Sequence, residues 1–287
     1  MTEVIANLKD LATKLPKGIN TNALALVEKM TTPIEGLGDD PEKAKWRPTN
    51  IKLVQGTTDR SKLPKGATIG TLVLGENVMD QPLRVIVLGV WNGRQMWDPD
   101  QNTAKLLCSS PDGKAGYLGY DCKNGCPHSV WDDVAKRTEC GATYEMLVIT
   151  EDLTEIFKVS FSKTGYANGK LWFSKMKEAG VALYRKVYGL RSETNKQYKQ
   201  VESLVVEYYS DPKERDTAPE LLEFLSEMFK MVQSDRKESL DSFHKGIADK
   251  RAKGLVAALP NANAGTVMID APAPAAETSA QAKKYSV

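Results

Sequence analysis

Four cysteines are the residues of this chain whose type and spacing point most directly to chemistry. Cys108, Cys122, Cys126 and Cys140 fall within 33 residues, with 13, 3 and 13 residues between successive members. A thiolate pair separated by two to four residues can hold one tetrahedral Zn²⁺, and four thiolates complete its shell. A complete shell leaves no position for water, so the ion would stabilise the fold without catalysing a reaction. We therefore predict one structural zinc ion per chain, bound by these four cysteines.

Other roles for the cysteines stay open at this point. Four cysteines can form two disulfide bonds, but no secretory signal opens the chain, so we do not expect an oxidising compartment. A redox-active pair usually has two residues between its cysteines, whereas Cys122 and Cys126 are separated by three. His128 lies two residues after Cys126 and could replace one cysteine as a ligand or hydrogen-bond to a sulfur.

Residue patterns typical of an active site are missing from the sequence. The chain has two histidines, His128 and His244, and contains no G-x-x-x-x-G-K-[ST], G-x-S-x-G or H-E-x-x-H motif. The close carboxylate pairs of the central region, at residues 98/100 and 132/133, could bind Mg²⁺, but such loops are more often simply solvated. We therefore expect a binding protein and not an enzyme.

Basic and aromatic side chains alternate along several predicted strands. Aromatic rings stack on bases with ~1–3 kcal/mol each, while Lys and Arg neutralise phosphates. The residues that we expect to line a strand-binding groove are Arg84, Arg94, Tyr117, Tyr120, Lys158, Arg185 and Lys186. Tyr117 and Tyr120 lie in a Gly-rich loop that cannot bury them easily. Five larger rings are more often core residues than stacking platforms: Trp91, Phe157, Phe161, Trp172 and Phe173.

Charge is distributed unevenly along the chain. Residues 151–200 carry ten Lys or Arg against five Asp or Glu, and residues 201–258 carry nine against twelve. A basic middle suits binding of a polyanion, and an acidic helical region suits contact with a protein partner. The simpler interpretation is a solvated surface of mixed charge.

The hydrophobic period divides the chain into four regions. Residues 1–49 contain two short helices, broken at Pro16-Lys17-Gly18, and a Pro- and Gly-rich extended arm. Residues 50–210 contain short strands and one helix over residues 169–178, and residues 211–258 contain a long amphipathic helix. Residues 259–287 are rich in Ala and Pro and are expected to be a disordered tail. The predicted fold is α+β with a mainly β core, an OB-like antiparallel barrel with an inserted zinc loop and flanking N-terminal and C-terminal helices.

One strong turn signal follows the longest apolar run. Residues 83–91 are rich in β-branched side chains, which favours a buried strand, and Asn92-Gly93 comes directly after Trp91. We therefore predict that the chain reverses at Asn92-Gly93 and that residues 94–97 begin the return strand.

The order of motifs around the cysteines resembles a group of bacteriophage proteins. Cys-Ser-Ser-Pro-Asp-Gly is followed by Gly-Tyr-Asp-Cys-x-x-x-Cys-Pro-His-Ser-x-Trp and then by a last cysteine before a strand. This order is similar to zinc-containing single-stranded DNA-binding proteins with an OB barrel, over roughly residues 46–210. The resemblance implies that Cys108, Cys122, Cys126 and Cys140 hold zinc and that the chain protects single strands during phage replication or recombination.

Proteins of that kind often end in an acidic tail that recruits replication enzymes. The last residues of this chain include Lys283 and Lys284, so the tail departs from that pattern. The acidic residues of the predicted C-terminal helix are the better candidates for recruitment: Glu220, Glu223, Glu227, Asp235, Glu238 and Asp241.

Together these patterns predict a sequence-tolerant single-stranded DNA-binding protein in the cytoplasm of a bacterial host. We expect self-association along the strand and contact with replication or transcription enzymes through the acidic helix. No membrane contact is expected, because no apolar run approaches the ~18–20 residues that span a bilayer. Two alternatives remain, namely a zinc-ribbon accessory factor that contacts a polymerase or a similar enzyme, and a structural protein that uses zinc only as a staple.

Overall fold

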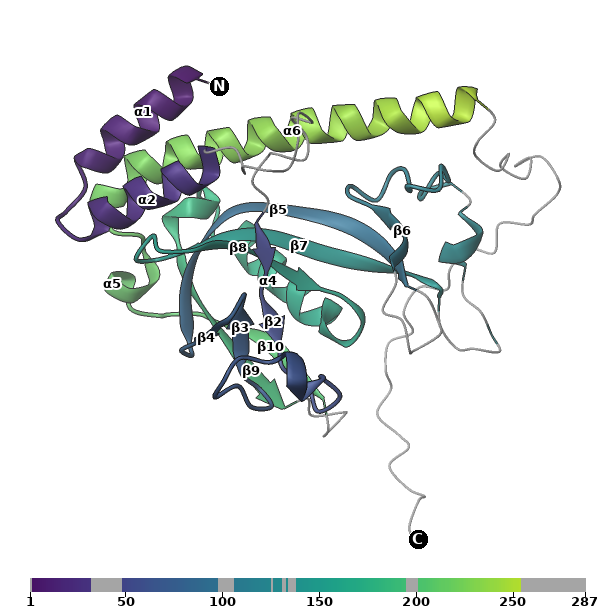
Figure 1. Ribbon diagram of the computed structural model, residues 1–287, viewed down its shortest axis with the longest axis horizontal. Helices are drawn as coiled ribbons and strands as arrows, with labels where there is room; N and C mark the ends of the chain where they lie inside the picture. The colour runs from purple at the N-terminus through teal and green to yellow at the C-terminus, as the bar shows by residue number, and fades with distance from the viewer. Residues whose placement is uncertain are drawn as a thin grey trace, which may run out of the picture. The chain divides into compact units, whose positions relative to one another are not determined.

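The computed structural model begins with two short helices (Figure 1). It describes residues 2–31, 48–97, 106–124, 126–130, 133, 138–194 and 201–253. α1 (Thr2–Thr13) and α2 (Ile19–Thr31) are separated at Pro16-Lys17-Gly18, as the sequence predicts. Gly18 has a φ of +96°, a conformation that glycine adopts without strain. Most of the predicted extended arm lies outside the described residues.

A curled, mixed sheet forms the centre of the fold. Its order is β1-β8-β7-β5-β9-β10, with β6 paired to β5. β1 runs parallel to β8, and every other neighbouring pair in this sheet is antiparallel. The α+β class and the barrel-like curl are therefore as predicted, although the described strands form a half-barrel. The strands are β1 (Thr49–Asn50), β5 (Leu83–Trp97), β6 (Leu106–Ser110), β7 (Cys140–Thr150), β8 (Ile156–Phe161), β9 (Val187–Thr194) and β10 (Glu202–Glu207).

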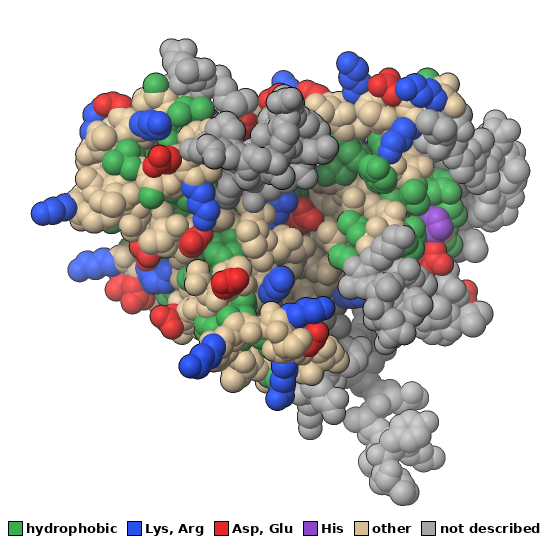
Figure 2. Space-filling view, in the orientation of Figure 1, with side chains coloured by type: hydrophobic (Ala, Val, Ile, Leu, Met, Phe, Trp, Pro, Cys, Tyr) green, Lys and Arg blue, Asp and Glu red, His purple; other side chains and the backbone are tan. Residues whose placement is uncertain are grey.

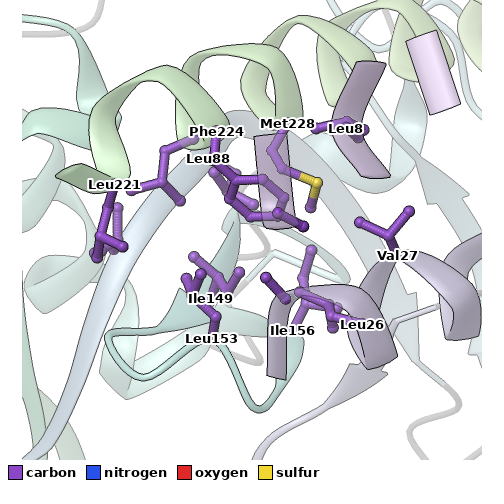
Figure 3. Packing of buried hydrophobic residues seen from close by; sticks show 14 of the residues in the cluster. Leu8, Leu26, Val27, Leu88, Ile149, Leu153, Ile156, Leu221, Phe224 and Met228 are labelled. Atoms are coloured by element: carbon purple, nitrogen blue, oxygen red, sulfur yellow. The ribbon is translucent and has the colours of Figure 1, made fainter. Parts of the chain in front are cut away.

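The outer face of the sheet is covered by helices. α1, α2 and the 31-residue helix α6 (Leu222–Ala252) lie above the arch of β5 and β7 in Figure 1. Their apolar side chains meet Leu88, Ile149 and Ile156 of the sheet in one buried cluster (Figure 3). Phe224 and Met228 of α6 point into this cluster and are at most 1% exposed. The first half of α6 is therefore a core element.

The inner face of the sheet is covered by α4 (Tyr166–Glu178) and a small second sheet. That sheet contains β2 (Lys52–Leu53), β3 (Leu72–Leu74) and β4 (Asn77–Met79) in the order β2-β3-β4. Phe157, Phe161 and Trp172 are at most 1% exposed in this second cluster, which confirms their assignment to the core. Trp91 and Phe173 are only half-buried at the margins of the two clusters.

The predicted hairpin at Asn92-Gly93 is wrong. β5 continues through both residues, and they pair with Tyr144 and Thr143 of β7. A Cβ on Gly93 would lie 2.9 Å from both the Ser110 carbonyl oxygen and the Thr143 hydroxyl. Glycine is therefore required there for close approach of neighbouring atoms and not for a turn.

Two side-chain amides cap the outer edge of β10. The Gln55 side chain donates to the carbonyl oxygen of Glu202 at 2.8 Å and accepts from its N–H at 2.9 Å. Asn168 donates to the carbonyl oxygen of Leu204 at 2.9 Å. These amides satisfy main-chain groups that a further strand would pair with in a closed barrel.

The chain divides after Ala257, and Met1–Ala257 is its first compact unit. All of the described elements belong to the first unit, including the short helix α5 (Pro212–Arg215). The predicted disordered tail, residues 259–287, lies outside the described residues. Within the described part of the chain, no helix has the length and apolar character needed to cross a bilayer.

Candidate metal centre and nucleic-acid interface

The two outer cysteines lie in one row across three strands. Cys108 of β6 and Cys140 of β7 both pair with Met96 of β5, one on each side. Directly paired residues of a sheet point to the same face, so both thiols emerge beside the Met96 side chain. Both outer cysteines therefore lie on strands of the central sheet.

A small hairpin brings Cys122 to this row. The N–H of Cys122 donates to the carbonyl oxygen of Lys114 at 2.8 Å, and the N–H of Gly116 donates to that of Tyr120 at 2.9 Å. A Cβ on Gly116 would lie 3.0 Å from Cys108 Sγ and 3.5 Å from Cys122 Sγ. The absence of a side chain at Gly116 therefore lets these two thiols approach each other.

Cys126 completes the set at the start of a single 3-10 turn, Pro127–Ser129. The turn carries His128, whose Nδ1 lies 2.5 Å from Glu139 Oε2 and whose ring meets the edge of the Tyr120 ring. All four cysteines and His128 line the same small pocket, and all four cysteines are free thiols.

Burial and one cation control the charge of these thiols. Cys122, Cys126 and Cys140 are 5–7% exposed. Burial raises the pKa of Cys140 to about 11 and also raises the pKa of Cys122, and the nearby Arg94 guanidinium opposes both shifts. Arg94 lines the thiol pocket, so it is placed to balance part of the negative charge that thiolates would carry.

The four thiols are suitable zinc ligands, but they lie too far apart here to form a metal shell. Within the described ranges, no group of three or more His, Cys, Asp or Glu side chains is arranged closely enough to hold a metal ion. A tetrahedral shell with Zn–S distances of ~2.3 Å therefore requires the thiols to draw closer together than they lie here. The convergence of four thiols on one pocket is the observation that favours a metal.

The seven residues predicted for a strand-binding groove do not lie on one surface. Arg84 and Arg94 are ten residues apart on β5, which corresponds to roughly 33 Å along an extended strand. Arg84 forms an ion pair with Glu151, donates to the carbonyl oxygen of Glu214 at 2.8 Å and covers the Tyr209 ring. Its charge is therefore held within the fold.

The other basic residues of that set are also dispersed. Lys186 is 2.5 Å from Asp216 and only 18% of its side chain is exposed. Arg185 is exposed, in the turn that precedes β9, and Lys158 lies on β8, where it pairs with Leu147 and Asn50. The separation from the thiol pocket is along the strands: Lys158 pairs with Leu147, seven residues from Cys140 on β7, and Val187, next to Lys186, pairs with Ile86, ten residues from Met96 on β5.

Three predicted residues do gather near the cysteines. Arg94 and Tyr120 line the thiol pocket. Tyr117 is 56% exposed at the tip of the small hairpin, with Lys250 Nζ 3.6 Å from its ring centroid. The segment 108–126 that carries these tyrosines is called the Cys loop below.

Between α4 and the Cys loop, the inner face of the sheet has a stretch of which sequence reasoning identified only Arg94. Asn92 pairs with Tyr144 and Arg94 pairs with Ala142, and Tyr144 belongs to the inner cluster. Asn92, Arg94 and Ala142 therefore point to the inner face beyond Tyr144, and none of the three is buried. This set is called the inner floor. Figure 2 shows one face of the molecule hollowed in its middle, with both basic and acidic side chains around the hollow.

One face of α4 borders the inner floor. Tyr166, Lys170, Phe173 and Lys177 recur at spacings of four, three and four residues, which places them on one helix face, called the α4 stripe. The rings of Tyr166 and Phe173 lie 5.0 Å and 5.6 Å from the Tyr144 ring, and Lys177 covers the Phe173 ring at 4.7 Å. The basic and aromatic periodicity of residues 166–177 is the sequence signal that would have identified this stripe.

Comparison with known proteins finds no match. No family model matches the chain, and no curated protein and no solved structure is significantly similar to it.

Proposed function

We propose that the protein binds single-stranded DNA without sequence specificity, across the inner floor and the α4 stripe, and that the Cys loop is stabilised by zinc. The observation that carries the proposal is the part of the sheet beyond Tyr144, where Asn92, Arg94 and Ala142 are not buried. Arg94 lies on it, and partly exposed aromatic rings and two lysines of α4 border it. Rings for stacking beside cations for phosphates are the combination that holds a single strand.

The side chains of the α4 stripe are suited to the two parts of a nucleotide. Tyr166 is half-buried, so it presents ring surface while its packing on Tyr144 keeps it in place, and Phe173 packs on Tyr144 with Lys177 over its ring. Lys170 and Lys177 are exposed and, among the described residues, form no ion pair that a phosphate would have to break. Arg84 and Lys186 have carboxylate partners and are not part of the proposed surface.

Zinc belongs to this proposal as a structural group. Cys108, Cys122, Cys126 and Cys140 would hold it, and bound zinc would fix the loop that forms one side of the inner floor. The OB type of the barrel and the phage origin rest on the resemblance of the cysteine motifs and are proposed together with the function. Glu139 would orient His128 beside the thiols in the manner of an outer-shell partner.

A salt titration tests strand binding. Tryptophan fluorescence would be followed while oligo(dT) is added at several salt concentrations, using the whole chain. Lys170→Ala combined with Lys177→Ala should weaken binding and flatten the slope of log affinity against log salt by roughly one to two units, at about 0.7 per phosphate. The matched control is Lys9→Ala combined with Lys237→Ala, which removes the same charge from exposed positions of the outer helices. Absence of binding by the wild type at low salt, or equal effects of both pairs, would reject the proposal.

A second candidate is an accessory factor that contacts another protein. Exposed apolar side chains gather near the cysteines: Trp97 and Leu106 form a cross-strand pair and are 36% and 41% exposed, and Val130 is 65% exposed. Such a cluster suits a protein partner better than a polyanion. Trp97→Ser should leave oligo(dT) affinity unchanged under the first proposal. Under this alternative it should abolish retention of a polymerase that the wild-type protein retains.

A further inference from the structure

α6 changes its role halfway along its length. The buried residues of its first half, of which Val232 is the last, pack into the outer cluster, and beyond them Ile247 is the one residue of the helix that is buried. Figure 1 shows the second half continuing past α1 and α2 toward the end of the sheet that carries β6. Helix propensity alone does not explain this extension, because helices gain most of their stability from a packed face.

The second half of α6 is attached to the Cys loop by basic side chains. Arg236 donates to the carbonyl oxygen of Pro111 and lies over the Trp91 ring at 4.8 Å. His244 Nε2 is 3.1 Å from Asp112 Oδ2, and neither atom has a hydrogen bond within the described part of the chain. Arg251 donates from Nε and Nη2 to the carbonyl oxygen of Gly119, at 3.0 Å and 2.5 Å. Lys250 is the cation over the exposed Tyr117 ring.

The contacts of Lys250 and Arg251 fall on the turn that controls thiol spacing. Gly119 donates its N–H to the carbonyl oxygen of Gly116 at 2.7 Å, and Gly116 is the residue against which Cys108 Sγ and Cys122 Sγ lie. A shift of the Gly119 carbonyl therefore moves the backbone that sets the distance between these thiols. The Tyr117 ring, with Lys250 on it, is part of the same turn.

We propose that the second half of α6 is the positioning element of the Cys loop. Arg251 and Lys250 hold the turn at residues 116–120 so that the thiols converge and Tyr117 is fixed with one ring face covered by a cation. Binding of metal by the thiols and docking of α6 on the loop then favour each other, because each orders the same turn. The metal part of this inference rests on the proposed zinc site, whereas the positioning of the turn does not.

Paired variants of the whole chain test this role. Lys250→Ala combined with Arg251→Ala removes both contacts with the turn. Lys237→Ala combined with Lys245→Ala removes the same charge from exposed positions on the same half of the helix. Amide exchange at Gly116, Gly119 and Cys122, whose N–H groups close the hairpin, should become at least about tenfold faster in the first pair only. Zinc retention against a chelator should fall about tenfold in the same pair, and Arg251→Lys should retain part of the exchange protection.

The two readouts separate the two proposals. Unchanged exchange in the Lys250/Arg251 pair, or equal acceleration in the control pair, would overturn the positioning role whatever the metal content. A wild-type protein that takes up no zinc would remove the metal site, and the exchange data would then decide the positioning role by themselves. Faster exchange with unchanged zinc retention would overturn the coupling to metal.

Discussion

Asp216 accepts hydrogen bonds from two basic side chains beside the start of β9. Hydrogen bonds from Arg215 and from Lys186 lower the pKa of this carboxyl to about 2, and an isolated bridge between Lys186 and Asp216 joins the start of β9 to the segment after α5. A basic residue that is paired with a carboxylate in this way binds a phosphate less strongly, because its charge is already neutralised. The same applies to Arg84, whose hydrogen bond to Glu151 raises the pKa of its guanidinium.

Asp216→Asn should lower stability in a defined pH window. The pKa of this carboxyl is depressed on folding, so its contribution is present above the unfolded value of 3.8 and is lost as pH falls toward about 2. Because the side chain is 43% exposed, solvent screening limits the loss to about 1 kcal/mol or less at pH 7. Urea unfolding at pH 7, 4 and 2 measures this, with Asp241→Asn on the exposed face of α6 as the control. If the unfolding free energies of the wild type and Asp216→Asn differ by the same amount at all three pH values, the pKa of Asp216 is not lowered on folding.

Gly116 offers a sharper test of the thiol pocket. Its backbone is compatible with alanine, so Gly116→Ala changes only the space, and its Cβ would meet Cys108 Sγ at 3.0 Å. We expect about tenfold weaker zinc retention against a chelator and a lower melting temperature. Gly141→Ala is the matched control beside Cys140, because a Cβ there meets no atom within 4 Å. Equal zinc retention in the two variants would mean that Cys108 and Cys122 do not share a metal.

At the scale of elements, periodicity predicted the helices well and the strand connections less well. The helix breaks at Pro16 and Gly18 and the apolar stripe of α6 are local signals, and both are confirmed. The reversal expected at Asn92-Gly93 is wrong. Glycine is needed at residue 93 because atoms of β6 and β7 lie too close to β5 there for a side chain. Local turn chemistry carries no information on which residues a distant strand places beside it.

The edge of β10 is a second feature that depends on distant partners. Gln55→Ala should remove both hydrogen bonds to the Glu202 backbone and cost about 1–2 kcal/mol, because these main-chain groups lose their partner. Amide exchange at Glu202 should accelerate, since its N–H is no longer held. Gln55→Glu keeps the acceptor and loses the donor, so it should protect this N–H more than alanine does. Identical exchange in the wild type and Gln55→Ala would show that the amide does not cap the edge.

At the scale of the whole molecule, the sequence predicted the class and the cysteine cluster but not the surface. The convergence of the thiols follows from spacing that is readable along the chain, and the structure brings all four to one pocket. The proposed strand-binding surface combines Arg94 with Tyr166 and Phe173, which are more than 70 residues further along the chain. Only the packing of α4 against Tyr144 brings these residues together, and that packing depends on the register of β7.

The position of α6 also changes what a truncation can test. Removal of everything from Ala218 onward would delete Leu221, Phe224 and Met228 from the outer cluster, so loss of partner binding in such a protein would reflect unfolding. An informative comparison uses two shorter deletions. One chain ends at Ala257, the boundary of the first compact unit, and the other ends at Asp235, just past the last core residue of the first half of α6, Val232.

The two truncated chains should behave differently. The chain ending at Ala257 should keep the melting temperature and oligo(dT) affinity of the whole protein, because the first unit contains both clusters and the Cys loop. The chain ending at Asp235 should keep its outer cluster but lose the contacts of Arg236, His244, Lys250 and Arg251 with the loop. It should therefore retain far-ultraviolet circular dichroism of the remaining elements while zinc retention and oligo(dT) affinity both fall. If it binds zinc and single strands as tightly as the longer chain, the second half of α6 serves neither site and its role must lie with a partner protein.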